Sequence, residues 1–530
     1  MSKRNVIITI LSVLFIVYSI SVITFLRQFK SPQEFLLYMF SRFPESTYEV
    51  SLATRKYQPS RGPVNTIRLD QVLSLRKMLT SSEFDELNKQ LDDYQKSFEA
   101  NYMNEYMVFD AFQSFGILLP AFESYLQDWI DYSPEDYQPY LARAFYYYEK
   151  GWQSRGFKWA RATTEEQFAG MELYFSKAKA DINKSLEINS RLMPAYYLLI
   201  SIYSATGEDD EENKTIKKGI ELFPYSYLVR KMAIHVKLPR WGGSYYEMEL
   251  LAKDAEKYAV QNPELYSLYG FIYTDQADIL ERKNKLEKVA DLYRKALNYG
   301  DNWEFYYDRA SFYEFNMNDS IKALSDVNRA IFIRPTQDDA YLLRSKIFFY
   351  LGDYKKSLED LYNAQSLNPG EEFIQRWRES SSIRLMNQGH EIFNKNNYAD
   401  AIDKYSFALQ FNGTNPEAFY WRGISYYRLK QYEHAMDDFI NAISANPHYF
   451  EAYRMIDYLK SMQGDWASII SYWDRFLSLE PNHAGALLER AGTYYHMRNF
   501  DNCLRDLKKS CDLGNNEACA KYRQMKNILR

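Results

Sequence analysis

The stretch that decides the fold is residues 416–449, which read PEAFYWRGISYYRLKQYEHAMDDFINAISANPHY. Counted from Pro416, small residues stand at positions 8, 20 and 27, and large aromatic residues stand at positions 4, 11 and 24. Small residues at these positions let two antiparallel helices approach at the near end of the usual range of about 8–10 Å. Pro447, at position 32, lacks a backbone N–H and therefore stops the second helix. The stretch predicts a helical hairpin.

The same pattern recurs along the C-terminal half of the chain. The stretches that align with 416–449 are 304–337, 338–371, 382–415, 450–483 and 484–517, preceded by a longer and weaker copy at 263–303. The 450–483 copy departs most, because Asp457 and Ile469 replace small residues at positions 8 and 20, which predicts looser helix packing there. A weaker spacing of the same kind occurs at Tyr140, Ala144 and Tyr147. Since one hairpin cannot bury its apolar face alone, we expect the copies to stack into an α-solenoid over 263–517.

These copies resemble the tetratricopeptide repeat (TPR), except that the leading tryptophan of the signature is displaced by two residues, to Trp421. The resemblance implies an all-α fold and a groove, lined by the first helix of each repeat, that binds partner proteins. The residues expected to bind a partner there are Phe305, Phe312, Phe349, Tyr350, Phe393, Tyr420, Tyr427, Arg428, Arg454, Tyr458 and Tyr495. Aromatic residues are enriched at protein interfaces. The alternative is that a chain with 48 tyrosines places some of these rings between adjacent helices.

The N-terminal half, 31–262, is predicted to be an irregular helical domain. It contains GWQSRG at Gly151–Gly156 and KLPRWGGS at Lys237–Ser244. On these strings it resembles an uncharacterised helical domain of bacterial proteins, which implies a bacterial source and transfers no activity. Two glycines beside Arg240 and Trp241 would let a backbone approach a ligand closely. We favour the alternative, a helix-breaking turn with Trp241 anchored in the core.

One apolar segment near the N-terminus predicts a membrane anchor over residues 1–30. Residues 6–26 carry no charge and are flanked by lysine and arginine on both sides. As a helix they would be about 31 Å long, which is roughly the thickness of the hydrocarbon core. A cleaved signal peptide and a buried core helix are the alternatives, but the length of the uncharged run favours a retained transmembrane helix. The flanking positive charge is almost balanced, so it does not set the orientation.

The three cysteines are Cys503, Cys511 and Cys519. The last two flank the turn in SCDLGNNEACAKY, which resembles the Sel1-like relatives of the TPR family and implies a disulfide between them. The alternative is three reduced thiols. A bridge favours an oxidising compartment, so we expect a single-pass protein of the bacterial inner membrane with its bulk in the periplasm. The cytoplasmic face is the alternative. Residues 518–530 are expected to cap the solenoid as a helix.

Composition and motifs narrow the function. The net charge of −5, without a basic block, argues against nucleic acid as a partner. Phosphate-binding glycine loops, catalytic signatures and metal-ligand spacings do not occur, so we expect no catalytic residue, no metal site and no small-molecule cofactor. The leading hypothesis is a membrane-anchored scaffold or adaptor that binds proteins in the TPR groove. A dedicated inhibitor or immunity-type protein neutralising a single partner is the alternative. An enzyme comes third, and would require a deep pocket containing Arg240 and several buried carboxylates.

Overall fold

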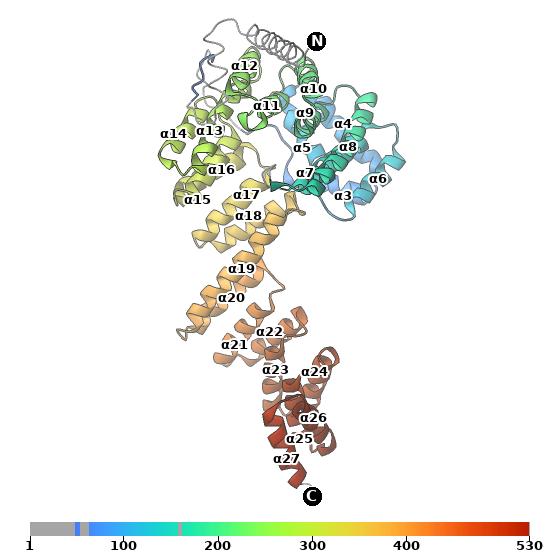
Figure 1. Cartoon of the computed structure of the whole chain (residues 1–530), viewed down its shortest axis with the longest axis vertical. Helices are drawn as coiled ribbons and strands as arrows, with labels where there is room; N and C mark the ends of the chain where they lie inside the picture. Colours follow the sequence, from blue (N-terminus) through green and yellow to red (C-terminus); the bar gives the residue numbers. More distant parts are fainter. Residues whose placement is uncertain (1–47, 54–62, 157–161, 529–530) are drawn as a thin grey trace, which may run out of the picture. The chain divides into compact units, whose positions relative to one another are not determined.

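The computed structural model describes residues 48–53, 63–156 and 162–528 of the chain (Figure 1). The regular elements in these ranges are all helices, which confirms the predicted all-α class for this part of the protein. The predicted transmembrane segment, 6–26, lies outside the described residues. Among the described residues, no helix combines the length and the apolar character needed to cross a bilayer.

The chain divides into two compact units, residues 1–371 and 372–530. The irregular part of the first unit contains α3 (Leu69–Thr80), α4 (Phe84–Ala100), η1 (Tyr102–Asn104), α5 (Glu105–Gln113), α6 (Phe122–Tyr132), α7 (Tyr137–Arg155), α8 (Glu165–Ile188), α9 (Met193–Thr206), α10 (Asp209–Leu222), α11 (Tyr227–His235), η3 (Pro239–Trp241) and α12 (Tyr245–Glu256). Its later part contains η4 (Pro263–Tyr269), α13 (Gly270–Arg282), η5 (Leu286–Lys288), α14 (Val289–Leu297), α15 (Trp303–Phe315), α16 (Ser320–Ile333), α17 (Asp338–Tyr350) and α18 (Tyr354–Leu367).

The second unit is a run of helical hairpins. Its helices are α19 (Glu372–Phe393), α20 (Tyr398–Phe411), α21 (Pro416–Arg428), α22 (Tyr432–Ala445), α23 (Phe450–Met462), α24 (Trp466–Leu479), α25 (Ala484–His496), α26 (Phe500–Asp512) and α27 (Asn516–Ile528). Small residues set the spacing within a hairpin, as the sequence pattern predicts. A Cβ atom on Gly423 of α21 would lie 2.8 Å from the Phe439 ring of α22, so only glycine lets that ring reach the helix backbone.

The first unit joins the irregular helices to the early hairpins without a break in packing at residue 262. The guanidinium of Arg76, on α3, donates hydrogen bonds to the backbone carbonyls of Ser114 (2.7 Å), Ser366 (2.7 Å) and Leu367 (2.6 Å). The backbone N–H of Val64 donates to the carbonyl of Ile333 at 3.1 Å. These contacts connect residues that are far apart in the sequence, and they explain why the compact division falls at 371/372.

A buried arginine–aspartate pair holds together the two helices of several hairpins. In each pair an arginine on the first helix donates two hydrogen bonds, between 2.6 and 3.0 Å long, to both carboxylate oxygens of a buried aspartate on the second helix. Three of these arginines also donate to the second helix of the preceding hairpin. The pairs, which we call arginine clasps, are Arg309–Asp326, Arg344–Asp360, Arg422–Asp438 and Arg490–Asp506, and the additional acceptors are Asn328, Ser406 and Asp474.

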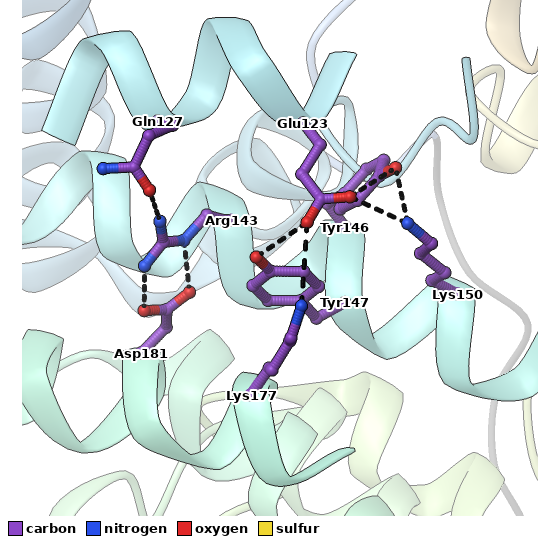
Figure 2. A network of polar contacts seen from close by, with 8 residues as sticks. All are labelled: Glu123, Gln127, Arg143, Tyr146, Tyr147, Lys150, Lys177 and Asp181. Atoms are coloured by element: carbon purple, nitrogen blue, oxygen red, sulfur yellow. Dashed lines mark hydrogen bonds and ion pairs between the residues drawn. The ribbon is translucent and has the colours of Figure 1, made fainter. Parts of the chain in front are cut away.

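The same contact occurs in the irregular part of the first unit, between α6, α7 and α8 (Figure 2). Arg143 of α7 donates two hydrogen bonds of 2.7 Å to Asp181 of α8, and its remaining guanidinium nitrogen contacts Gln127 of α6. Arg143 directly precedes Ala144 in the weak repeat-like spacing at residues 140–147. The α7–α8 hairpin therefore packs in the manner of the later repeats, although its helices are longer.

Beside this clasp, a second group of polar contacts fixes α6 against α7 and α8. Glu123 of α6 accepts hydrogen bonds from Tyr147 (3.0 Å) and Lys150 (2.8 Å) of α7, and Lys177 of α8 lies 3.9 Å away (Figure 2). Burial alone would raise the pKa of Glu123, but the hydrogen bonds from Lys150 and Tyr147 outweigh it and hold that pKa below its usual range. Each of these polar side chains finds its hydrogen-bond or ion-pair partner within the group, so the group stabilises the fold.

Candidate partner-binding surfaces

Three of the predicted groove residues are buried in the first unit. The side chains of Phe305, Phe312 and Phe349 are 0%, 1% and 4% exposed, so the prediction that they line an accessible groove is wrong. Phe305 packs edge-on against Phe271 of α13, with ring centroids 5.0 Å apart, and Phe312 contacts Tyr293 of α14. The preceding hairpin, α13 and α14, thus covers Phe305 and Phe312. Tyr350, at the end of α17, is 49% exposed.

In the second unit, the predicted aromatic residues are accessible to different degrees and form two contacting groups. Phe393 of α19 meets Trp421 of α21 with ring centroids 5.4 Å apart, and Trp421 meets Tyr420 at 5.7 Å. Tyr427 of α21 meets Tyr458 of α23 at 5.8 Å, and the Tyr427 hydroxyl donates to that of Tyr458 at 3.3 Å. The aromatic row is the name used below for Phe393, Tyr420, Trp421, Tyr427, Tyr458 and Tyr495.

Members of the aromatic row come from successive first helices. Tyr458 and Tyr495 are 47% and 50% exposed, whereas Phe393, Tyr420 and Tyr427 are partly buried. Tyr495 of α25 contacts Phe500 and His496. Large rings that are only partly covered provide contact area at low entropic cost, as binding surfaces require.

Trp421 belongs to the row but was not among the predicted groove residues. It stands at position 6 of its repeat, two residues after the usual place of the signature tryptophan, and so lies on a different side of α21. Its ring is partly buried and contacts His390 of α19 at 4.8 Å. The displaced tryptophan was itself the signal that could have identified this residue as part of the surface.

The two predicted groove arginines differ in their partners. Arg454 of α23 is paired with Glu489 of α25 at 3.0 Å, and because both side chains are exposed this pair contributes about 0.2–1 kcal/mol at most. Arg428, the last residue of α21, is exposed, and no hydrogen bond or ion pair reaches its side chain from the described residues. Arg428 is thus a positive charge available beside the aromatic row.

The KLPRWGGS string forms a turn between α11 and α12, as favoured from sequence. Gly242 adopts a φ of 93°, and a Cβ on Gly243 would lie 2.2 Å from the carbonyl oxygen of Lys237, so both glycines serve the turn. The expectation that Trp241 anchors in the core is wrong, because its side chain is 46% exposed. Arg240, the preceding residue, pairs with Asp275 at 2.7 Å.

Arg240 lines a cavity of about 370 Å³, formed by α11, η3, α13, α14 and α15. Its wall also contains the carboxylates of Asp275, Asp278, Glu281, Glu304 and Asp308. The enzyme hypothesis required several buried carboxylates beside Arg240, and of these five only Asp275 is buried. Most of these carboxylates are already held: Asp278 and Asp275 by Arg240, and Glu281 by the Tyr293 hydroxyl at 2.6 Å.

At the C-terminal end of the chain, Cys511 of α26 and Cys519 of α27 form a disulfide, with Cα atoms 4.5 Å apart. The bridge spans the turn between the last two helices, as the likeness to Sel1-like repeats implies. Cys503 is a buried free thiol at position 20 of its repeat, where the pattern calls for a small residue.

Family comparisons agree with both parts of the sequence pattern. Residues 71–211 match the domain of unknown function DUF4034, and residues 338–371, 389–430 and 416–449 match tetratricopeptide repeats. The DnaJ homolog subfamily C member 7 homolog of Schizosaccharomyces pombe is 29% identical over 28% of this chain and 32% of its own length. A TPR repeat-containing protein of Methanocaldococcus jannaschii is 24% identical over 51% of this chain and 47% of its own length. The chain thus spans less than half of either relative.

Two solved structures are also similar to this chain. The TPR domain of P58(IPK) is 16% identical, with a TM-score of 0.23, over 67% of this chain and 93% of that domain. PilW, a type IV pilus biogenesis factor, is 19% identical, with a TM-score of 0.23, over 43% of this chain and 98% of its own. Neither likeness bears on function. The protein therefore contains tetratricopeptide repeats, matched over 338–371 and 389–449, and a DUF4034 domain, matched over 71–211.

Proposed function

We propose that this protein is a membrane-anchored scaffold whose C-terminal repeats bind a partner protein on the aromatic row. TPR proteins are in general protein–protein interaction scaffolds, and the row supplies the surface such a role needs. The observation that carries the proposal is the contact between Tyr427 and Tyr458, which places two partly exposed rings from neighbouring repeats side by side. Arg428 adds an available positive charge next to them.

The anchor and the compartment form the second part of the proposal. The uncharged run 6–26 supports insertion into a bilayer. The Cys511–Cys519 disulfide supports an oxidising compartment, which in a bacterial cell is the periplasm. We therefore propose a single-pass protein of the inner membrane with the repeats on the periplasmic side. Labelling with a membrane-impermeant maleimide in intact cells, before and after reduction, tests this: Cys511 and Cys519 should react only after reduction.

Partner binding is tested with a photo-crosslinking amino acid placed at Tyr458 or at Tyr495 in the full-length protein. Both side chains are about half exposed, so the probe should not disturb the fold. The matched control position is Tyr362 of α18, a tyrosine that is 66% exposed but lies on a second helix, outside the aromatic row. We expect crosslinks to a defined protein from the two row positions and not from the control.

The double variant Tyr427→Ala/Tyr458→Ala then separates specific capture from nonspecific capture. Removing both rings should reduce the amount of the crosslinked partner at least tenfold, while Tyr362→Ala leaves it unchanged. Equal capture from the control position, or capture that survives the double variant, would rule out the row as the binding surface. Recovery of a single partner in a tight one-to-one complex would favour the dedicated inhibitor or immunity-type protein over a scaffold with several partners.

A further inference from the structure

Two cavities in the first unit share the residues His235 and Glu304. One is the cavity of about 370 Å³ that contains Arg240, and the other, of about 300 Å³, lies between α7, α9 and α11. The lining of the first includes five carboxylates, and the lining of the second includes four large aromatic rings. We refer to them together as the composite cavity. Each is near the lower end of the size range of ligand sites, which suits a side chain or a short peptide segment.

The aromatic half brings together the two strings that marked the N-terminal half of the sequence. Trp152 comes from GWQSRG on α7, and Trp241 comes from the KLPRWGGS turn. Tyr148 and Tyr197 complete this wall, and the Tyr148 hydroxyl is hydrogen-bonded to Ser201 at 2.8 Å. Trp241 also lines this cavity, but its indole ring is exposed. An exposed ring contributes little to packing of the core, so packing does not explain its position.

The acidic half holds more negative charge than positive charge. Across the composite cavity, five carboxylates face two fixed cations. Arg240 lies 2.7 Å from Asp275 and 3.1 Å from Asp278, and Lys231 pairs with Glu304. His235 lines both halves. Desolvation by the surrounding protein, helped by the positive charges of Lys231 and Arg240, lowers its pKa, so it adds no positive charge at neutral pH. Arg282, which does not line the cavity, also pairs with Asp278 at 2.6 Å, so three cations stand against five carboxylates and an excess of acidic groups remains.

Asp308 is the carboxylate of this cavity that lacks a partner among the described residues. Unlike the other four carboxylates, it receives no hydrogen bond or ion pair from the side chains that the structure describes. Burial raises its pKa to about 8, and the charges of Glu304, Asp278 and Glu281 raise it further than Lys231 lowers it. At neutral pH this carboxyl group therefore carries a proton in place of an ion-pair partner. A bound cation would supply the missing charge and displace that proton.

We propose that the composite cavity binds an arginine side chain presented by a peptide segment of a partner protein. The guanidinium would lie against the Trp152 and Trp241 side of the cavity and pair with the carboxylate of Asp308. A guanidinium fits both halves because its planar cation stacks on aromatic faces and pairs with carboxylates. A lysine ammonium is a compact and strongly hydrated charge that lacks the planar surface. All residues of this site belong to the unit of residues 1–371, so it is separate from the aromatic row and independent of the proposed function there.

The experiment uses the full-length protein and a synthetic peptide, acetyl-Gly-Gly-Arg-Gly-Gly-amide, measured by isothermal titration calorimetry at pH 7. A second peptide replaces arginine with citrulline, which has the same shape without the charge, and a third replaces it with lysine. The expected result is at least tenfold weaker binding of the citrulline and lysine peptides. Repeating the titration in two buffers of different ionisation enthalpy should show that about one proton is released per arginine peptide, as the linkage at Asp308 requires.

Two variants tie the binding to the site. Asp308→Asn keeps the shape of the protonated carboxyl group, so the fold is maintained, and it should weaken arginine binding about tenfold and abolish proton release. Trp241→Ala removes an exposed ring and should weaken binding severalfold while proton release persists. The matched control is Asp339→Asn, which alters a carboxyl group in a different cavity of about 290 Å³ and should change neither quantity. The proposal is overturned by absence of binding up to millimolar peptide, by equal affinity for arginine and citrulline or for arginine and lysine, or by unaltered proton release in Asp308→Asn.

Discussion

Replacing Arg422 with methionine removes one arginine clasp and keeps an unbranched side chain in its place. Arg422 donates to the two carboxylate oxygens of Asp438 at 2.8 and 2.7 Å, and Asp438 is 2% exposed. Removing one partner of a buried pair leaves an uncompensated charge and costs about 3–5 kcal/mol. Because the Arg422 side chain is 20% exposed, we expect the lower end of that range, about 3 kcal/mol.

The loss of stability in Arg422→Met should depend on pH in a defined direction. Burial raises the pKa of Asp438 above its ordinary value even though Arg422 lowers it, so the pKa must rise further once the arginine is gone. For an acid whose pKa is higher in the folded protein, stability is complete below the unfolded-state pKa and is lost as pH rises through the folded-state pKa. The deficit of Arg422→Met relative to the natural protein should therefore be largest at pH 8 and should shrink toward pH 5.

Hydrogen exchange measured by mass spectrometry suits this test, because unfolding of a repeat array is not a single two-state step. Peptides from 416–449 should exchange about a hundredfold faster in the variant at pH 8, since each 1.4 kcal/mol corresponds to a factor of about ten. Peptides from α20 should be affected less, through the lost hydrogen bond to Ser406 (3.2 Å). Arg422→Met/Asp438→Asn is the control and should lose the pH dependence. A deficit that grows toward acid, or protection within threefold of the natural protein at pH 8, would refute the reasoning.

Three further predictions concern the second unit. Gly423→Val should lower stability by about 1–3 kcal/mol, seen as a lower melting temperature, because its Cβ would lie 2.8 Å from the Phe439 ring. Cys519→Ser should cost about 2–3 kcal/mol and speed hydrogen exchange in α27, and reductant alone should have the same effect on the natural protein. Burial raises the pKa of Asp457 to about 6, so stability is lost as pH rises through 6; Asp457→Asn should raise the melting temperature at pH 8 and change it little at pH 4.

The repeating part of the fold could be predicted from sequence because its determinants are local. Small residues such as Gly423 and Ala435, and a proline after the second helix, fix one hairpin without reference to distant residues. Residues 372–381 interrupt the regular spacing of the repeats without ending a helix, since α19 runs without interruption from Glu372 to Phe393 and carries a buried Trp377. The arginine clasps were missed, although the aspartate recurs at position 23 and the arginine at position 6 or 7 of the repeats that carry them, because a pattern of small and large residues contains no information on charge.

Contacts between distant segments could not be predicted. The hydrogen bonds of Arg76 to carbonyls of α18 join residues that are almost 300 positions apart, and they have no local sequence pattern. The burial of Phe305 has the same origin, because the residue sits at a groove position but the adjoining α13 supplies Phe271 to cover it. The composite cavity likewise depends on tertiary placement, which brings Trp152 and Trp241 together.

Uneven distribution of the arginine clasps gives the second unit an uneven elasticity. In the second unit the 416–449 and 484–517 repeats carry the arginine and the aspartate. The two positions hold Gln388 and Lys404 in 382–415, and Ile456 and Tyr472 in 450–483. The clasp of Arg422 joins α20, α21 and α22, and that of Arg490 joins α24, α25 and α26, so α23 lies between two braced segments. Under tension between α20 and α26, this part of the solenoid should extend most easily at the unclasped helix between the two clasped segments. We expect stretching to be taken up first around α23, the helix that carries Tyr458, so a load on the chain would alter the spacing of the rings in the aromatic row.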